Sequence, residues 1–157
     1  MITQQQLNGF LGKSIAQICP NGYTSDAHNH GAHFVGHALG YAFGATCHLI
    51  GKRNGPAASV RVQEILSACP KLGVWSLRPS TLIACLVFIT RASNVNLSGK
   101  VMANAPRKHV GICVGGFVWH YSNSRHKVVR QTPAEFSLHY HPPDNAMFYG
   151  SLPGMRT

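Results

Sequence analysis

Two histidines that lie eleven positions apart are the main candidates for acid–base chemistry in this chain. His109 begins the apolar run HVGICVGG, and His120 lies in the next run, FVWHYSN. The pair Gly115-Gly116 separates the runs and can form a turn that brings two strands side by side. In that arrangement His109 can act as a general base while His120 orients its ring. Such a base can deprotonate a thiol at the first turn of a helix, where N–H groups and the helix dipole stabilise the thiolate.

The segment HNHGAHFVGHALGY, residues 28–41, has the pattern of a helix that can present such a nucleophile. Asn29 is a good N-cap, Gly40 can end the helix, and apolar residues recur between them at helical spacing. Gly31 falls in the first turn, although a glycine there costs about 1 kcal/mol relative to alanine. Position 31 therefore lacks a side chain at the place where an anionic reactive group is best stabilised.

The rest of the chain supplies elements that can position these residues. Helical patterns come first, at residues 3–18 and 59–68. Four apolar runs follow, at residues 81–90, 109–116, 117–123 and 126–132. They predict an antiparallel meander, after which a short helix can begin at Thr132 and a strand can form within residues 145–152. We therefore predict an α+β fold, in which N-terminal helices pack on an antiparallel sheet and residues 1–157 form a single domain.

The charge of the chain favours anionic partners. The chain contains fourteen Lys and Arg residues but only four Asp and Glu residues, which gives a net charge of +10. A cell-wall polymer, a phospholipid surface and nucleic acid all carry the matching charge. The basic residues come in short groups without a long basic run, so we expect no nucleic-acid partner. The small number of carboxylates also argues against chemistry by paired Asp and Glu residues.

Membrane and export signals are missing from the sequence pattern. No apolar segment reaches the roughly 18 residues of a membrane span, so we expect no stable membrane insertion. The opening residues, MITQQQLNGF, lack the basic and apolar regions of an ordinary signal peptide. We expect either a cytoplasmic protein or one that a specialised route carries to a target-cell periplasm or cell wall.

The five cysteines form no CxxC pair. Cys85 and Cys113 lie in apolar runs and are expected as buried thiols, whereas Cys19, Cys47 and Cys69 lie near predicted loops, where two of them can form one disulfide. The cysteines therefore do not show whether the protein works in an oxidising or a reducing compartment.

Histidines at helical spacing raise the question of a metal. His30, His33 and His37 share a predicted helix face, and with His28 they can bind zinc. However, Phe34 stands where a zinc peptidase needs its glutamate, and no acidic residue is near to orient the imidazoles. We therefore expect His33 to be a buried structural residue, and we expect no metal and no other cofactor. His139 and His141, before Pro142-Pro143, are expected at the surface.

The order of these motifs resembles a known family. A helix with NHGAHFV, then LVF at residues 86–88, then HVGI at residues 109–112, then Trp119-His120, is similar to the papain-like cell-wall hydrolases of the NlpC type. The resemblance covers residues 22–122. In that family a nucleophilic cysteine opens the helix, the base histidine begins the HVGI-like strand, and a third polar residue lies on the next strand.

The resemblance implies a role for each matching position. Gly31 occupies the nucleophile position, His109 is the base and His120 is the orienting residue. Asn123 is a second candidate for the orienting role, and Tyr23 is a candidate oxyanion donor beside the backbone N–H of residue 31. Arg107 comes shortly before the base histidine. It is expected either at the cleft rim, where it can hold a substrate carboxylate, or in a solvated charged turn.

The function that the resemblance implies is hydrolysis of amide bonds in peptidoglycan stem peptides by a cysteine form of the chain. Gly31 then reflects either a substitution of a native cysteine or a natural pseudoenzyme. An antibacterial effector of the type VI kind, with an immunity protein as partner, fits the missing signal peptide and the basic charge.

Two other functions stay open. One is a non-catalytic module that binds cell-wall peptides or a partner protein. The other is a thiol acyltransferase or deamidase, because AHFV also resembles the NCEHFV motif of the lecithin:retinol acyltransferase relatives. Those relatives place the HVGI-like strand before the cysteine helix, whereas here it follows, which favours amide hydrolysis.

Overall fold

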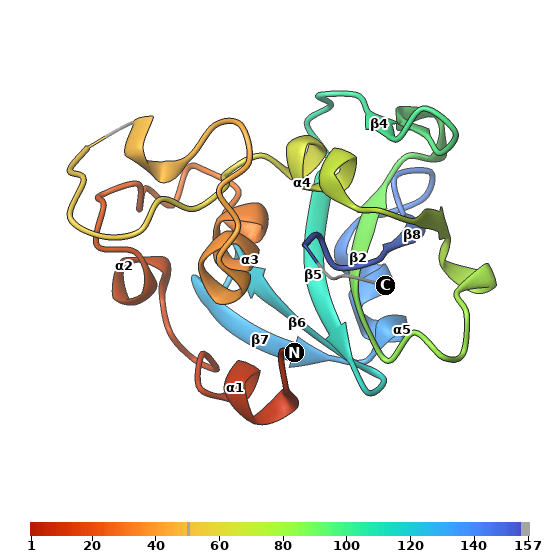
Figure 1. Ribbon diagram of the computed structural model, residues 1–157, viewed down its shortest axis with the longest axis horizontal. Coiled ribbons are helices and arrows are strands. Elements are labelled where there is room, and N and C mark those ends of the chain that lie inside the picture. Colours follow the sequence, from red (N-terminus) through yellow and green to blue (C-terminus); the bar gives the residue numbers. More distant parts are fainter. Residues whose placement is uncertain (50, 155–157) are drawn as a thin grey trace.

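An antiparallel sheet forms the centre of the protein, seen in a computed structural model that describes residues 1–49 and 51–154. Its order in the described residues is β1-β8-β2-β5-β6-β7 (Figure 1). The strands are β1 Leu72–Val74, β2 Ala84–Thr90, β5 Lys108–Val114, β6 Phe117–Ser122, β7 Lys127–Gln131 and β8 Ala146–Gly150. A separate small sheet pairs β3 Val95–Asn96 with β4 Val101–Met102. The predicted meander is confirmed, because β2, β5, β6 and β7 are successive neighbours.

The helices are short and most precede the sheet in sequence. They are α1 Gln4–Asn8, α2 Ile15–Ile18, α3 Gly31–Leu39, α4 Val62–Ala68 and α5 Pro133–Phe136, the last of them begun by Thr132 as predicted. Short 3-10 turns are η1 Cys47–Leu49, η2 Trp75–Leu77, η3 Ala92–Asn94 and η4 Ser137–His139. Helix α3 packs against β5 and β6 (Figure 1). The mixed arrangement of helices and antiparallel sheet agrees with the predicted α+β class.

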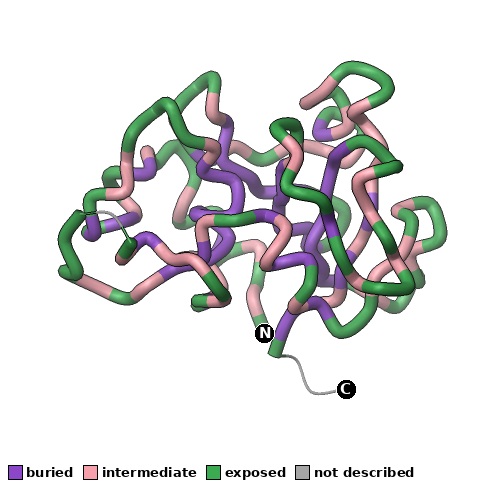
Figure 2. Tube along the Cα trace, turned by 90° about the horizontal axis from the view of Figure 1, so that it is seen from above, coloured by how far each residue is buried: buried purple, intermediate pink, exposed green. Residues whose placement is uncertain are grey.

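The two faces of the sheet bury different side chains. On β2, Leu86 and Phe88 join the large core cluster that also includes Phe34 and Val35 of α3. Cys85, Val87 and Ile89 point to the opposite face, where they pack with Cys113 and with Phe136 of α5. This alternation follows from the two-residue period of a strand. Figure 2 shows the buried segments gathered in the centre, with exposed loops around them.

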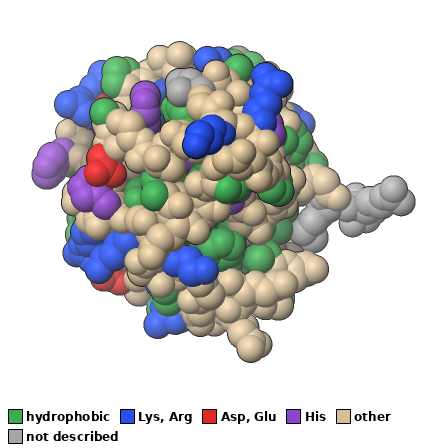
Figure 3. Space-filling model, turned by 90° about the vertical axis from the view of Figure 1, so that its left-hand side faces the viewer, with side chains coloured by type: hydrophobic (Ala, Val, Ile, Leu, Met, Phe, Trp, Pro, Cys, Tyr) green, Lys and Arg blue, Asp and Glu red, His purple; other side chains and the backbone are tan. Residues whose placement is uncertain are grey.

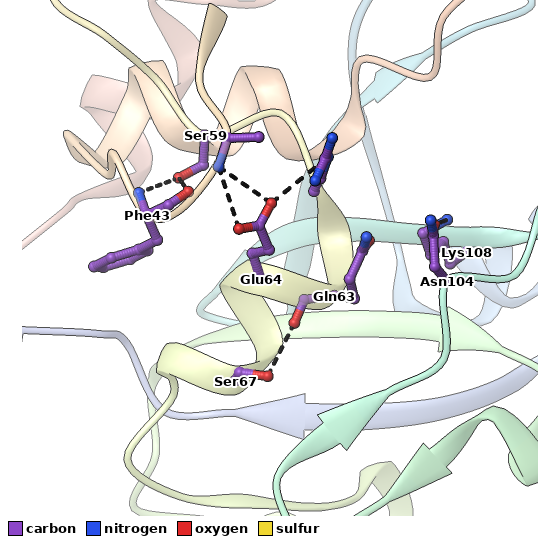
Figure 4. Close-up of polar contacts among 9 residues, drawn as sticks. Phe43, Ser59, Gln63, Glu64, Ser67, Asn104 and Lys108 are labelled. Atoms are coloured by element: carbon purple, nitrogen blue, oxygen red, sulfur yellow. Dashed lines mark hydrogen bonds and ion pairs between the residues drawn. The ribbon is translucent and has the colours of Figure 1, made fainter. Parts of the chain in front are cut away.

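The boundaries of two helices differ from prediction. The N-cap of α3 is His30 and not Asn29, although Asn29 Oδ1 still accepts the Gly31 N–H at 2.8 Å. Helix α4 begins at Val62, not at Ser59. Ser59 instead bonds backbone groups of Phe43, because its hydroxyl accepts that residue's N–H at 2.7 Å (Figure 4). Local capping rules identified both helices. They could not predict which backbone groups the side chains of Asn29 and Ser59 would bond.

Helix α4 holds the long loop that precedes it. The Glu64 carboxylate, labelled in Figure 4, accepts the Ala45 N–H at 3.2 Å, and its distance from Arg61 is 3.7 Å. Gly44 has a φ of +57°, and a Cβ built there would overlap the Glu64 carboxylate. Glycine is therefore required at position 44 for both its backbone conformation and the close approach of Glu64.

All five cysteines are buried and free. The buried thiols expected at Cys85 and Cys113 are confirmed, while the disulfide considered among Cys19, Cys47 and Cys69 is not formed. Within the described part of the chain, no helix has both the length and the apolar character to cross a membrane. On the face shown in Figure 3, Lys and Arg side chains form separate groups, as the sequence pattern indicated.

Candidate functional site

His109 and His120 meet inside the protein. His109 begins the buried part of β5 and His120 lies on the neighbouring β6, and His109 Nε2 is 3.1 Å from His120 Nδ1. Their exposed fractions are 0% and 2%. Gly111 permits this approach, because a Cβ at that position would lie 3.1 Å from the His120 Cβ and 2.7 Å from a methyl of Val118. The contact expected between a base and its orienting residue is present.

The histidine pair is contacted at each end by an amide side chain. His120 Nε2 lies 2.6 Å from Gln131 Oε1, and His109 Nδ1 lies 3.2 Å from Asn29 Oδ1. An amide oxygen can only accept, so Gln131 requires the proton of His120 on Nε2. His120 Nδ1 is then an acceptor and takes the Nε2–H of His109. This assignment leaves a lone pair on His109 Nδ1, which faces the Asn29 oxygen without a proton between them, on the side where residue 31 lies.

Position 31 directly faces His109. A Cβ built on Gly31 would lie 2.5 Å from His109 Nδ1 and 3.1 Å from Asn29 Oδ1. The first distance is shorter than real side-chain contacts, so the imidazole occupies part of the space that a side chain at residue 31 would need. Any larger residue at this position must displace the His109 ring, and its first atoms would then contact Nδ1.

Asn29 and Asn123 form the support beneath the start of α3. Asn29 Oδ1 accepts N–H groups from Gly31 and from the Asn123 side chain, the latter at 3.1 Å, and Asn29 Nδ2 donates to the Lys108 carbonyl at 2.8 Å. Asn123 Oδ1 accepts the His30 N–H at 3.0 Å. Asn123 thus lies at the site, but its side-chain hydrogen bonds are with His30 and Asn29 at the start of α3, whereas His120 of β6 contacts the ring of His109.

His139 covers His109 and is not the surface residue that we predicted. The two imidazole rings stack with centroids 4.1 Å apart and an angle of 6° between their planes. Phe136, fully buried, packs edge-on against His120 with a centroid distance of 4.9 Å. The capped turn from Thr132 into α5 and η4 folds this segment back over the histidine pair. The sequence showed the helix start, but it did not show which face of the sheet the following turn would cover.

The imidazoles of the site are neutral at neutral pH. Burial lowers the pKa of His120 to about 4, and burial together with His139 and His120 lowers the pKa of His109 well below its usual value. Burial also lowers the pKa of His139. No carboxylate is hydrogen-bonded to these rings in the described structure, so the charged forms lack compensation. A positive charge on His109 would need a nearby anion, such as a thiolate at residue 31.

A cavity of about 680 Å³ opens beside this chain of residues. His120, Gln131, Asn29, Asn123 and His139 all contribute to its wall. Gly31 and His109 are buried behind that wall. The cavity therefore reaches His120 and His139, whereas neither Gly31 nor His109 contributes to its wall.

Tyr23 and Arg107 lie away from the histidine pair. The Tyr23 ring stacks on His28 with centroids 4.9 Å apart and meets His33 edge-on, so it packs beside α3. Arg107 pairs with Asp144 at 3.2 Å and lines a separate hollow of about 240 Å³. Of the two positions considered for Arg107, its 68% exposed side chain matches the charged surface turn.

Two groups of His and Cys side chains in the described residues bring their donor atoms together: His109, His120 and His139, and Cys19, His33, His37 and Cys47. The first group is poorly arranged for a metal ion. The lone pair of an imidazole lies in the plane of its ring, and the planes of His109 and His139 are nearly parallel and stacked. The two rings therefore cannot both direct a lone pair at one ion. This group is better suited to proton transfer.

Gln131, Asn29 and His139 are the site residues that sequence reasoning missed. Asn29 did carry a signal, because its capping type placed it at the helix start. Gln131 and His139 carried none, since their positions depend on the register of β6 with β7 and on the path of η4.

The geometry as a whole is a helix start whose first residue faces a buried pair of imidazoles. Such an arrangement can position a nucleophile at residue 31 against a base. Comparison of the chain with protein-family models, with curated proteins and with solved structures found no significant match. The function of the site must therefore be inferred from its own residues.

Proposed function

We propose that the chain has a papain-like fold of the NlpC type and that its cysteine form hydrolyses amide bonds in peptidoglycan stem peptides. The observation that carries the proposal is the position of residue 31, whose Cβ direction points at His109 Nδ1 while Nε2 of the same ring is held by His120. A helix start, a base and an orienting residue come from the three elements that the resemblance to this family requires. The chain with Gly31 lacks the nucleophile and is inactive by this mechanism.

The proposed reaction uses the chain's own groups in sequence. The thiolate of the Gly31→Cys form would attack the carbonyl carbon, and His109 Nδ1 would hold the thiol proton and pass it to the departing amine. His120, fixed by Gln131, would keep the ring of His109 in the required orientation. Water would then hydrolyse the thioester. The backbone N–H of residue 31 is bonded to Asn29 Oδ1, so it can stabilise the oxyanion only after the Asn29 side chain turns away.

The basic charge of +10 supports an anionic cell wall as the place of action. Delivery into a target-cell periplasm, together with an immunity protein in the producing cell, is part of the same proposal. A cytoplasmic location and an acyltransferase or deamidase activity are its rivals.

A non-catalytic binding module is the second candidate function. It is favoured by the Gly31 chain itself, in which the His109 ring packs closely against residue 31 and is covered by His139. In that case the cavity beside His120 recognises a wall peptide or a partner protein without reacting with it.

The test compares Gly31→Cys with the Gly31 chain on purified peptidoglycan, following new amine termini and fragment masses. Gly31→Ala is the matched control, since it adds the same Cβ against His109 but no thiol. We expect cleavage by the cysteine variant alone, and loss of cleavage when His109→Ala is added, with a rate effect that can reach about 10⁶ for a missing catalytic unit. Equal binding of wall fragments by all forms with no cleavage by any of them would overturn the hydrolase and support the binding module. Acyl transfer to an added amine in place of hydrolysis would support the acyltransferase.

A further inference from the structure

A second cluster of chemically active side chains lies beside α3, apart from the histidine pair. Its members are Cys19 at the end of α2, His33 and His37 on α3, and Cys47 at the start of η1. The four donor atoms all lie within 4.8 Å of one another. His33 and His37 are one helical turn apart, so both rings leave the same face of α3. Elements α2 and α3 are in contact, and both lie with the loop that carries Cys47 toward the left of the view in Figure 1.

Two separations between donor atoms are close to the edges of a tetrahedral zinc site. Zinc binds nitrogen at about 2.0–2.1 Å and sulfur at about 2.3 Å, which makes the ligand–ligand edges of a tetrahedron about 3.3 to 3.8 Å. The observed separations are 3.2 Å between His33 Nε2 and His37 Nε2, and 3.9 Å between Cys47 Sγ and His37 Nε2. The planes of the two rings differ by 44°, so both lone pairs can converge on one point. This arrangement differs from the parallel rings of His109 and His139.

Hydrogen bonds around His33 leave the correct nitrogen free for a metal. His30 Nε2 lies 2.7 Å from the Ser25 carbonyl and must donate to it. His30 Nδ1 is therefore an acceptor, and it receives the Nδ1–H of His33 at 3.1 Å. The lone pair of His33 is then on Nε2, directed at the cluster. This is the outer-shell pattern typical of metal-bound histidines, in which the second ring nitrogen donates to a fixed acceptor.

Backbone and amide N–H groups point at the two sulfurs. Cys47 Sγ accepts the Asn21 Nδ2–H at 3.1 Å and the Ala58 N–H at 3.3 Å, and Cys19 Sγ accepts the Asn21 N–H at 3.4 Å. A neutral thiol is a weak acceptor, whereas a thiolate is a strong one. Cys19 and Cys47 are only 3% and 0% exposed, so two thiolates there need a cation. One divalent ion with two thiolates and two neutral imidazoles gives a site without net charge.

We propose that Cys19, Cys47, His33 and His37 bind one zinc-type divalent cation in a closed structural site. Binding converts both thiols to thiolates and releases their two protons to solvent, and no electron transfer is involved. The ion joins α2, α3 and the 41–60 loop, and it fixes the helix whose first residue is Gly31. The sequence alone predicts no metal here, because no carboxylate lies near the histidines of α3 and the two cysteines are distant from them in the chain. The cysteines lie 14 residues before His33 and 10 residues after His37 in the chain.

Metal content of the full-length protein tests the proposal directly. We expect one equivalent of zinc in protein purified without added chelator, and X-ray absorption should show two sulfur and two nitrogen ligands at about 2.3 and 2.0–2.1 Å. Cobalt(II) added to the metal-free protein should produce visible tetrahedral bands with thiolate charge-transfer absorption. Removing the metal should lower the melting temperature and make two more thiols reactive toward a thiol reagent.

Substitutions show whether these four residues are the ligands. Cys47→Ser and His37→Ala should lose the metal and the cobalt spectrum, whereas Cys113→Ser, which also replaces a buried thiol by a hydroxyl, should retain both. A Cys19–Cys47 disulfide in the purified protein, or failure of the parent chain to bind zinc or cobalt under reducing conditions, would overturn the proposal. Equal metal binding by Cys47→Ser and the parent chain would do the same. The measurements on the parent chain decide the matter even if a ligand variant fails to fold.

Discussion

Acid should destabilise this protein through its buried histidines, and His120 permits a quantitative prediction. Its pKa is about 4 in the folded protein, against an ordinary value of 6.5. The unfolded chain therefore binds more protons than the folded one between these values, and the free energy of unfolding falls as the pH is lowered from 6.5 toward 4. The full difference corresponds to about 3 kcal/mol, of which roughly half is lost between pH 6.5 and about pH 5. Carboxylates titrate mostly below that interval.

The assay is urea unfolding followed by tryptophan fluorescence at both pH values, for the parent chain and for His120→Phe. The variant should be less stable at pH 6.5, since His109 and Gln131 each lose a buried hydrogen-bond partner at a cost of about 1–3 kcal/mol. The decisive quantity is the drop in the free energy of unfolding between the two pH values, which should be smaller in the variant by about 1 to 2 kcal/mol. His141→Phe is the matched control, because His141 is exposed and outside the hydrogen-bonded chain. An equal drop in His120→Phe and the parent chain would refute the assignment of a buried neutral imidazole.

Three further substitutions test the packing around the site by urea unfolding. Asn29→Ala removes an acceptor of the Gly31 N–H and a donor to Lys108, and should cost about 1–3 kcal/mol, whereas an unchanged stability would contradict its supporting role. Phe136→Ala removes a fully buried ring beside His120 and should cost about 3–5 kcal/mol; a cost below about 1 kcal/mol would show that α5 is not packed there. Gly44→Ala should destabilise by more than about 1 kcal/mol, because its φ is +57° and the new Cβ meets Glu64; a stabilising effect would contradict this loop conformation.

The sequence predicted the strands and helices best where hydrophobic periodicity and capping, which act over a few residues, define them. The strand that carries His109 and the strand that carries His120 were both predicted, and so was the tight glycine turn between them. The prediction that the helix ends at Gly40 was also correct, because the φ of +73° at this position favours a residue without a Cβ. Short elements such as β1 were missed, since three residues leave too little pattern to recognise.

The sequence did not predict which distant segments of the chain lie next to one another. Strand β8, at the end of the chain, inserts between β1 and β2, and this order has no local signal. His139 was expected at the surface because it precedes a proline pair, but the turn from α5 places it on His109. Cys19 and Cys47 were considered for a disulfide, yet they converge with two histidines of α3. In each case the deciding contact joins residues whose separation in the chain gives no constraint on their distance in space.

The sequence by itself determined the α+β class, the meander, the helix whose first turn holds Gly31, and the two strands that carry His109 and His120. These depend on residue type and short-range spacing, which are local properties. Only the tertiary structure decided that His109 faces residue 31, that Gln131 and His139 complete its surroundings, and that four Cys and His side chains form a second cluster. Strand register and helix docking create those contacts, because they are set by the burial of apolar surface over the whole chain and not by any single segment.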